Sequence, residues 1–350
     1  MRNEDRKIIN VESVSIGKKP GENNDGIYVG EDFAAAIDGV SNNSAIEIDG
    51  KHIEIADIIT SAIRKIDGTG AFKSLNFEEF VKYINIYIRK YCEKVGYPLE
   101  EKPLEATAAI YSKYHNQIWL VGDARAICDG KVIQNELKID DVFTKIRIKL
   151  TNALLKEGYS KEQLMNGSSI ERKIIDNPEL IKEYIKDKET VKKIEEYLRE
   201  LMHKTLLECG FSEEKIAKEN LLDRYNSPKK LQKYLKNNPN VGEYGYAVFN
   251  GKDTEIKNCK VVNLSPCVET IKLFTDGIFV DNMEKSKDLG AVVRKLRKNA
   301  KKDPLSIGEN ETLKSAFYQS NRYPYLAIDD SSAVVIKIKE KTVKEMMEDR

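Results

Sequence analysis

Apolar and polar positions follow two different periodicities over the first third of the chain, that of a strand and that of a helix. Residues 11–16 alternate apolar and polar side chains, which predicts a strand. A run of small apolar residues over 33–37 ends at Asp38 and Gly39, which predicts a buried strand that stops at a turn. Apolar residues at helical spacing over 55–66 then predict a helix with one buried face.

A second helix is predicted to begin after Asn76. Glu79, three residues later, completes the sequence of a capping box, and Gly96 with Pro98 ends the apolar stripe. Further strands, separated by turn residues, are predicted at 106–112, 117–121, 125–128 and 131–134.

The pattern changes near residue 139, where Lys, Glu, Leu and Ile take over at helical spacing. Helices are predicted at 141–156, 178–186, 190–208 and directly after Ser227 and Pro228. Strand patterns resume at 244–250, 260–264 and 271–275, followed by a helix over 286–300 and a last strand over 332–339.

We therefore predict a core formed by residues 1–138 and 239–350, interrupted by a mainly helical insertion at 139–238. The plain interpretation of the insertion's charged residues is solvated helix faces. The functional interpretation is a lid or a docking surface for a partner.

Composition narrows the function classes. The 58 basic and 57 acidic residues give a formal net charge of +1, which argues against binding to nucleic acid or to an anionic membrane. No apolar run approaches the ~18 residues that span a bilayer, and the first residues lack the apolar region of a signal peptide. Five scattered cysteines without a C-x-x-C pair predict free thiols. We expect a cytoplasmic protein.

Acidic residues stand where predicted buried strands end. Asp38, Asp123 and Asp276 each have a glycine beside them, and the pair Asp329 and Asp330 precedes the last strand. A single Asp-Gly pair is ordinarily a turn, but carboxylates are costly to bury unpaired, so the repetition indicates convergence on a cation. Oxygen ligands of this kind suit Mg²⁺ or Mn²⁺.

Six short motifs, in this order, resemble the metal-dependent protein phosphatases of the PP2C family. They are NND (23–25), AIDGVS (36–41), EATAAI (105–110), VGDAR (121–125), FTDG (274–277) and DDSSAVVI (329–336). The resemblance covers residues 11–338 without the helical stretch. It implies an α+β fold, a four-layer α-β-β-α sandwich of two antiparallel sheets, with a centre of two Mg²⁺ or Mn²⁺ ions and a third ion in some members.

The resemblance also assigns roles to single residues. Asp38 would bridge both metals, Gly39 would offer its carbonyl, and Asp276 and Asp329 would complete the catalytic centre. The weaker candidates are Asp25, which matches an N-terminal acidic position near the metals, and Asp123, which matches a third-metal ligand; Thr107 and Ser332 match positions expected to be structural. The implied reaction is hydrolysis of phosphoserine or phosphothreonine in a protein by a water that two cations about 3.5–4 Å apart activate.

The chain departs from the family at the substrate side of this centre. Pro20 stands where many members carry an arginine that grips the substrate phosphate, and Lys18 and Lys19 just upstream offer only point charges. Val40 stands where eukaryotic members place a histidine proposed as general acid, so the leaving group would take its proton from water.

Two other functions remain open. The lost arginine and the altered loop after Gly39 favour a regulatory or binding module of the same fold with little turnover, whereas the retained Asp38, Asp276 and Asp329 favour the enzyme. An unrelated metal-dependent hydrolase of small phosphate esters is the third alternative. The absence of an Asp-x-Asp sequence at the end of the first strand weakens it.

Overall fold

The computed structural model describes residues 6–17, 23–40, 44–48, 50–69, 74–135, 137–160, 163–164, 170–278, 280–285, 289–292, 294 and 330–340. These residues form two compact units. The first holds the described residues up to Asn135 together with those of 247–296 and 328–350, and the second holds those of 136–246. The sequence pattern predicts boundaries after residues 138 and 238, three residues later and eight residues earlier than these.

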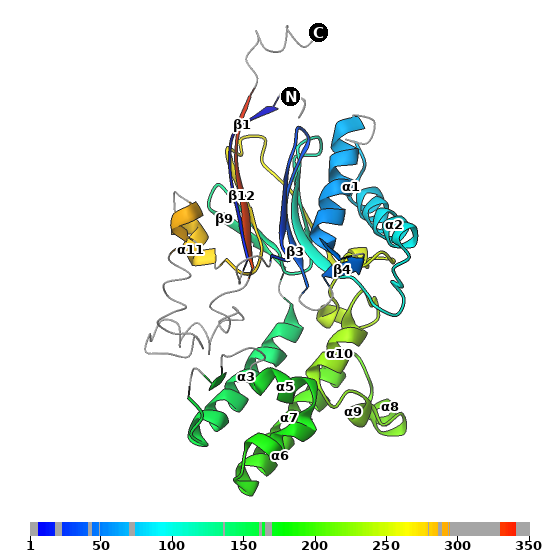
Figure 1. The fold of residues 1–350 in the computed structure, drawn as a ribbon, viewed down its shortest axis with the longest axis vertical. Helices are drawn as coiled ribbons and strands as arrows, with labels where there is room; N and C mark the ends of the chain where they lie inside the picture. Colours follow the sequence, from blue (N-terminus) through cyan, green and yellow to red (C-terminus); the bar gives the residue numbers. More distant parts are fainter. Residues whose placement is uncertain are drawn as a thin grey trace. The chain divides into compact units, whose positions relative to one another are not determined.

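Two five-stranded antiparallel sheets form the first unit (Figure 1). One sheet has the order β1-β12-β11-β8-β9, with β1 (Arg6–Ile16), β12 (Ser331–Glu340), β11 (Thr270–Phe274), β8 (Arg125–Cys128) and β9 (Lys131–Gln134). The other has the order β10-β7-β6-β3-β2, with β10 (Lys260–Asn263), β7 (Gln117–Val121), β6 (Ala106–Ser112), β3 (Phe33–Gly39) and β2 (Gly26–Val29).

Alternating side chains of the strands fill the space between the two sheets, as the period of two residues in a strand requires. One buried cluster there contains Ala34 and Ala36 of β3, Ala109 and Tyr111 of β6, Ile271 and Leu273 of β11, and Val334 and Ile336 of β12. The residues between them face outward: Ala35 and Ile37 join the helices on one side, and Phe274 and Ala333 join those on the other.

Helices cover both outer faces of the sandwich. On the β3 side lie α1 (Ile55–Thr69) and α2 (Phe77–Val95), and α2 begins with the predicted capping box at Asn76 and Glu79. On the β12 side lies α11 (Val280–Lys285), to which Lys272 of β11 donates a hydrogen bond at the Met283 carbonyl (2.7 Å). The layers follow the order helix, sheet, sheet, helix, so the predicted α+β sandwich is confirmed.

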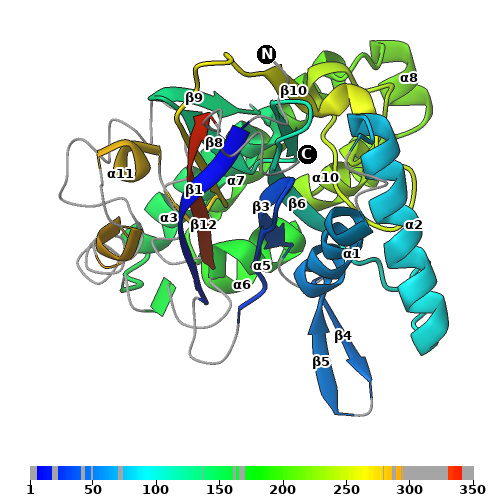
Figure 2. The same cartoon turned by 90° about the horizontal axis from the view of Figure 1, so that it is seen from above.

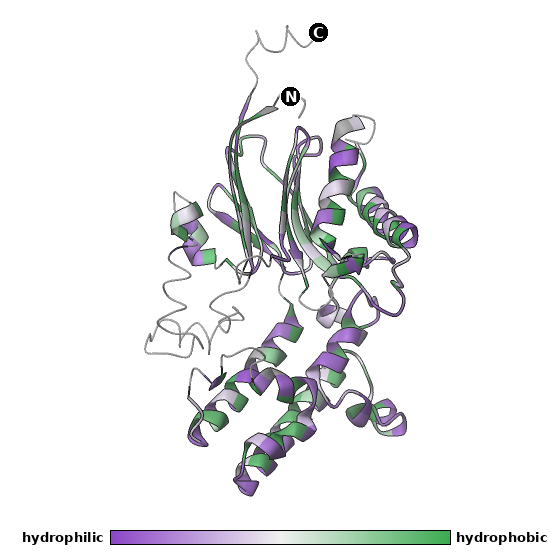
Figure 3. Cartoon of the chain, viewed as in Figure 1, coloured by the Kyte–Doolittle hydropathy of each residue, from purple (hydrophilic) through white to green (hydrophobic). Residues whose placement is uncertain are grey.

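The second unit is mainly helical. Its elements are α3 (Lys138–Lys156), α5 (Ile170–Asp176), η2 (Pro178–Leu180), α6 (Ile181–Tyr184), α7 (Lys188–Glu208), α8 (Glu213–Lys218), α9 (Leu221–Arg224), α10 (Pro228–Leu235) and η3 (Gly242–Tyr244). Hydrophilic and hydrophobic residues alternate along these helices (Figure 3), as amphipathic packing requires. A buried ion pair between Arg147 and Glu171 (3.1 Å) joins α3 to α5. The lid or docking role of this unit stays a prediction.

The structure differs from the predicted elements in several places, among them the short strand β2 and the helices α5, α8 and α9, which the sequence pattern did not predict. The strand predicted over 244–250 does not form: Tyr246 and Phe249 make only isolated bridges, to two different segments, although their side chains are buried. A hairpin of β4 (Ala45–Ile48) and β5 (Lys51–Glu54), which the sequence pattern did not predict, precedes α1 (Figure 2). Most of the helix predicted over 286–300 lies outside the described residues.

None of the helices that the structure describes has the length and apolar character needed to cross a membrane.

Asn85 fixes the segment after residue 249 to α2 with every hydrogen bond that an amide side chain can make. Its Nδ2 donates to the Val81 carbonyl and to Thr254 Oγ1, and its Oδ1 accepts from the backbone of Asn250 and Gly251.

Asn85→Ala removes the acceptor of the Asn250 and Gly251 N–H groups and two further hydrogen bonds, so we expect a loss of about 3 kcal/mol in the free energy of unfolding. Urea unfolding measures this loss. The exposed Lys90→Ala on the same helix is the control, and equal stability of the two variants would contradict the assignment.

Candidate metal centre

In each sheet, two neighbouring strands end or begin at the same end of the sheet. In the β3 sheet the antiparallel register pairs Gly39, at the end of β3, with Ala106, at the start of β6. In the β12 sheet it pairs Phe274, at the end of β11, with Ala333, near the start of β12. Asp38 therefore lies at the end of β3, and Asp276 lies directly after the end of β11.

The strand alternation sets which side chains enter the space between the sheets. Asp38 lies an even number of residues from the inward-facing Ala34 and Ala36, so its side chain is on the same face of the sheet. Thr275 lies two residues from the inward-facing Leu273 and is on that face of its own sheet. Asp330 precedes β12 with the parity of Val334 and is 5% exposed. The two sheets therefore both direct polar side chains into the same end of the buried interface.

Hydrogen bonds join these ends across the sandwich. Thr275 Oγ1 donates to Asp25 Oδ2 (2.8 Å), which links the end of β11 to the segment that enters β2. The backbone N–H of Asn24 donates to Asp330 Oδ2 (3.4 Å), which links the same segment to the start of β12. Residues more than 200 positions apart in the chain are thereby held together.

Two glycines allow the backbones to come this close. A Cβ on Gly39 would lie 2.4 Å from the Asn24 carbonyl oxygen, and a Cβ on Gly277 would lie 1.9 Å from the Asp330 carbonyl oxygen. Neither distance is possible for a real side chain, so the glycines of these two Asp-Gly pairs supply space as well as turns.

Asp123 is held from the neighbouring strand. Thr107, which pairs with Asp38 across β3 and β6, donates from Oγ1 to Asp123 Oδ1 (2.9 Å). The preceding Gly122 has φ of 76° and packs against the Thr107 side chain, where a Cβ would lie 2.2 Å away. Thr107 therefore connects the positions of Asp38 and Asp123, and its structural role stays a prediction.

The chemistry of the predicted ligands fits a hard divalent cation, because they are carboxylates and a glycine carbonyl. Over the part of the chain that the structure describes, no three His, Cys, Asp or Glu residues are grouped closely enough to hold a metal ion. The predicted ligand Asp329 and the predicted phosphate-binding Lys18 and Lys19 lie outside the described residues. The ligand set stays a prediction.

Sequence reasoning missed Thr275 and treated Asp330 only as the neighbour of Asp329. Counting the strand period back from the apolar Val334 would have placed Asp330 and Ser332 on the inward face. The hydrogen bond from Thr275 to Asp25 gave no local sequence signal, since the two residues are separated by 250 positions.

Four of the five cysteines do not offer an alternative chemistry. Burial raises the pKa of Cys92 to about 11 and that of Cys128, Cys209 and Cys259 to about 12, so these thiols are protonated at neutral pH.

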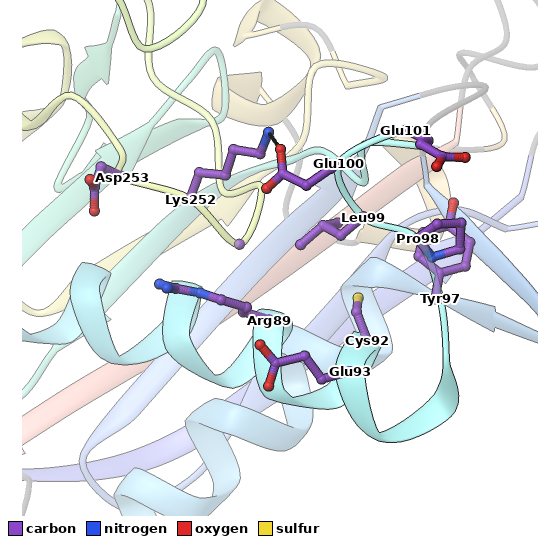
Figure 4. A pocket seen from close by; sticks show the side chains of 11 residues that line it. Arg89, Cys92, Glu93, Tyr97, Pro98, Leu99, Glu100, Glu101, Lys252 and Asp253 are labelled. Atoms are coloured by element: carbon purple, nitrogen blue, oxygen red, sulfur yellow. Dashed lines mark hydrogen bonds and ion pairs between the residues drawn. The ribbon is translucent and has the colours of Figure 1, made fainter.

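A cavity of about 420 Å³ opens at the C-terminal end of α2, and it is lined by Tyr97, Leu99 and Gly251 together with charged residues (Figure 4). Lys252 and Glu100 form an ion pair at this cavity. None of the predicted site residues lines it.

No protein-family model matches the sequence, and no curated protein matches it. Solved structures do match. The catalytic domain of the serine/threonine protein phosphatase PstP in complex with two manganese ions is 12% identical, with 95% of this chain and 98% of that chain covered and a TM-score of 0.37. The phosphatase PstP/Ppp of Mycobacterium tuberculosis is 13% identical, with 94% and 98% covered and a TM-score of 0.37.

The serine/threonine phosphatase Stp1 of Staphylococcus aureus is 12% identical, with 95% of this chain and 96% of that chain covered and a TM-score of 0.37. These three matching structures are serine/threonine phosphatases.

Proposed function

We propose that the protein is a phosphatase that depends on Mg²⁺ or Mn²⁺ and hydrolyses phosphoserine and phosphothreonine in proteins. One observation carries this proposal. Hydrogen bonds from Thr275 of the FTDG motif to Asp25 of the NND motif, and from Asn24 to Asp330 of the DDSS motif, join segments of both sheets, and Gly39 of the AIDG motif packs against the Asn24 backbone. Chance turns would not place four such motifs together.

Asp38, Gly39, Asp276 and Asp329 would hold the two ions, with Asp25 and Asp123 beside them. The ions, when bound, supply a water of lowered pKa and neutralise charge on the phosphoryl oxygens. Without them the carboxylates repel a phosphate dianion, because like charges within a few ångströms disfavour each other. The acidic residues therefore make substrate binding conditional on the metal.

Direct hydrolysis suits the remaining side chains better than a covalent phosphoenzyme. The four cysteines with raised pKa values supply no thiolate. Val40, directly after Gly39, has no proton to donate, so the leaving group takes its proton from water. Lys18 and Lys19 would attract the substrate phosphate as point charges.

Hydrolysis of p-nitrophenyl phosphate by the full chain, with Mn²⁺ and then with EDTA, tests this function. We expect turnover with Mn²⁺, loss of turnover with EDTA, and no turnover by Asp38→Asn at any Mn²⁺ concentration. A phosphothreonine peptide should be a better substrate than small phosphate esters. Turnover that EDTA and Asp38→Asn leave unchanged would contradict the proposal.

The absence of an arginine at Pro20 favours a second candidate, a regulatory module that binds a phosphoprotein or metal with little turnover. The same experiment separates the two functions. A chain that binds Mn²⁺ but hydrolyses neither the ester nor the peptide is a binding module, whereas metal-dependent turnover establishes the enzyme.

A further inference from the structure

Five residues at the candidate centre close a ring of hydrogen bonds that joins segments from both sheets. Asp25 N donates to Asn23 Oδ1 (3.2 Å), and Asn23 Nδ2 donates to Ser15 Oγ (2.7 Å). Ser15 Oγ and Ser332 Oγ lie 2.6 Å apart. The backbone N–H of Ser332 donates to Thr275 Oγ1 (3.0 Å), and Thr275 Oγ1 donates to Asp25 Oδ2 (2.8 Å), which completes the ring.

The hydroxyl of Thr275 is the point where this ring reaches a carboxylate. A threonine hydroxyl has one hydrogen to donate and two lone pairs to accept with. Two acceptors lie near it, Asp25 Oδ2 at 2.8 Å and the Ser332 carbonyl oxygen at 3.4 Å. The shorter bond to an ionised carboxylate is the stronger one, so the hydrogen is directed to Asp25.

Burial makes this arrangement specific. Thr275 and Ser332 are 0% exposed and Asp25 is 8% exposed, so water does not replace a lost partner at low cost. The Thr275 backbone N–H also donates to the Ser332 carbonyl (3.0 Å), which fixes the backbone of β11 against that of β12. The Asp25 carboxylate is therefore held at one oxygen by a side chain that cannot rotate freely.

We propose that Thr275 is a positioning residue for the metal centre: its hydroxyl sets the orientation of the Asp25 carboxylate and thereby makes Asp25 a metal-binding group. This inference rests on the proposed function, because it needs the centre to bind a divalent ion. The inference gives Thr275 a role that follows neither from the sequence motifs nor from the residue preferences of turns. Groups that hold ligands in place typically change metal affinity by about 10–100-fold when they are removed.

The test is Mn²⁺ binding to the metal-free full chain, measured by titration calorimetry without substrate. Thr275→Val removes the hydroxyl at nearly constant shape, and we expect Mn²⁺ affinity to fall at least about 10-fold. Thr275→Ser keeps the hydroxyl and should bind Mn²⁺ like the wild type. Thr270→Val makes the same exchange at the other end of β11, where the side chain is part of no such ring, and should also bind normally.

Far-UV circular dichroism and thermal unfolding show whether Thr275→Val is folded. If it is not, Thr275→Ala replaces it: this smaller variant removes the same hydroxyl from Asp25 Oδ2, and the same fall in Mn²⁺ affinity is expected.

The outcomes separate the inference from the proposed function. Folded Thr275→Val, or Thr275→Ala in its place, that binds Mn²⁺ as the wild type does overturns the inference alone. A wild type that binds no Mn²⁺ overturns the proposed function and the inference with it. Weak binding by Thr275→Ser as well would show that bulk, and not the hydroxyl, matters, which also contradicts the inference.

Discussion

Asp276→Asn and Asp329→Asn are each expected to lower kcat/KM for a phosphothreonine peptide by about 10²–10³-fold, the loss that follows removal of one large electrostatic contribution to a transition state. Asparagine keeps the shape of the side chain but removes the negative charge that a divalent cation requires. Asp276 lies in a turn after β11 and is half-buried, so the protein should still fold with the amide at this position.

Steady-state kinetics with Mn²⁺ measure this effect, and circular dichroism confirms the fold. Asp253→Asn makes the same change of charge at an exposed position outside the candidate centre, and its activity should equal that of the wild type. Full activity of either Asp276→Asn or Asp329→Asn would contradict the ligand assignment.

Asp330→Asn refines this first prediction. The amide oxygen of asparagine can still accept the Asn24 N–H that Asp330 Oδ2 accepts, so the fold should persist. If Asp329 is the ligand, Asp330→Asn loses much less activity than Asp329→Asn. The reverse order would move the assignment to Asp330.

Gly277→Ala is expected to destabilise the first unit by about 3 kcal/mol, at the upper end of the range for overpacked positions. The new Cβ would lie 1.9 Å from the Asp330 carbonyl oxygen, and that atom belongs to backbone rather than to a flexible side chain. The hydrogen bond from Thr275 N to the Ser332 carbonyl (3.0 Å) prevents β11 and β12 from moving apart without a further loss.

Urea unfolding followed by circular dichroism measures this effect. Gly130→Ala is the matched control: it places alanine at a φ of 82° with nothing within 4 Å of the new Cβ, so it costs only the backbone strain, about 1 kcal/mol. Equal stability of the two variants would contradict the close approach of residues 277 and 330.

The sequence predicted most of the first unit because its signals are local. The capping box at Asn76 and Glu79 and the stop at Gly96 fixed the ends of α2, and the turn residues separated β6, β7, β8 and β9 at the observed positions. Where signals were weak the prediction failed. β2 is only four residues long, and the hairpin β4–β5 carries charged residues that mask its strand pattern.

The strand predicted over 244–250 was wrong for a different reason. The apolar residues 246–249 are buried, as the pattern indicates, but burial alone does not make a strand. Lys236 pairs with Tyr246, and Ala106 pairs with Phe249, so the backbone bonds go to two separate partners and no ladder forms.

The sequence indicated which acidic residues are candidates for the site, but it did not indicate which residues form hydrogen bonds with one another there. The Asp-Gly motifs make Asp38 and Asp276 candidates from local sequence alone, and their role as ligands stays a prediction. The bonds that join the segments, such as Ser15 with Ser332 across 317 positions, depend on the register of β1 with β12 and on the packing of the two sheets. One chain without an alignment contains no local pattern that reports such a contact.

Anomalous diffraction from a crystal soaked with Mn²⁺ tests the central claim most directly, because it locates bound ions without reference to activity. We predict two manganese peaks about 3.5–4 Å apart, both in contact with the carboxylate of Asp38 and one with that of Asp276. Mn²⁺ peaks at other positions only would contradict this claim. So would a crystal that shows no Mn²⁺ peak and in which the carboxylates of Asp38 and Asp276 point away from each other.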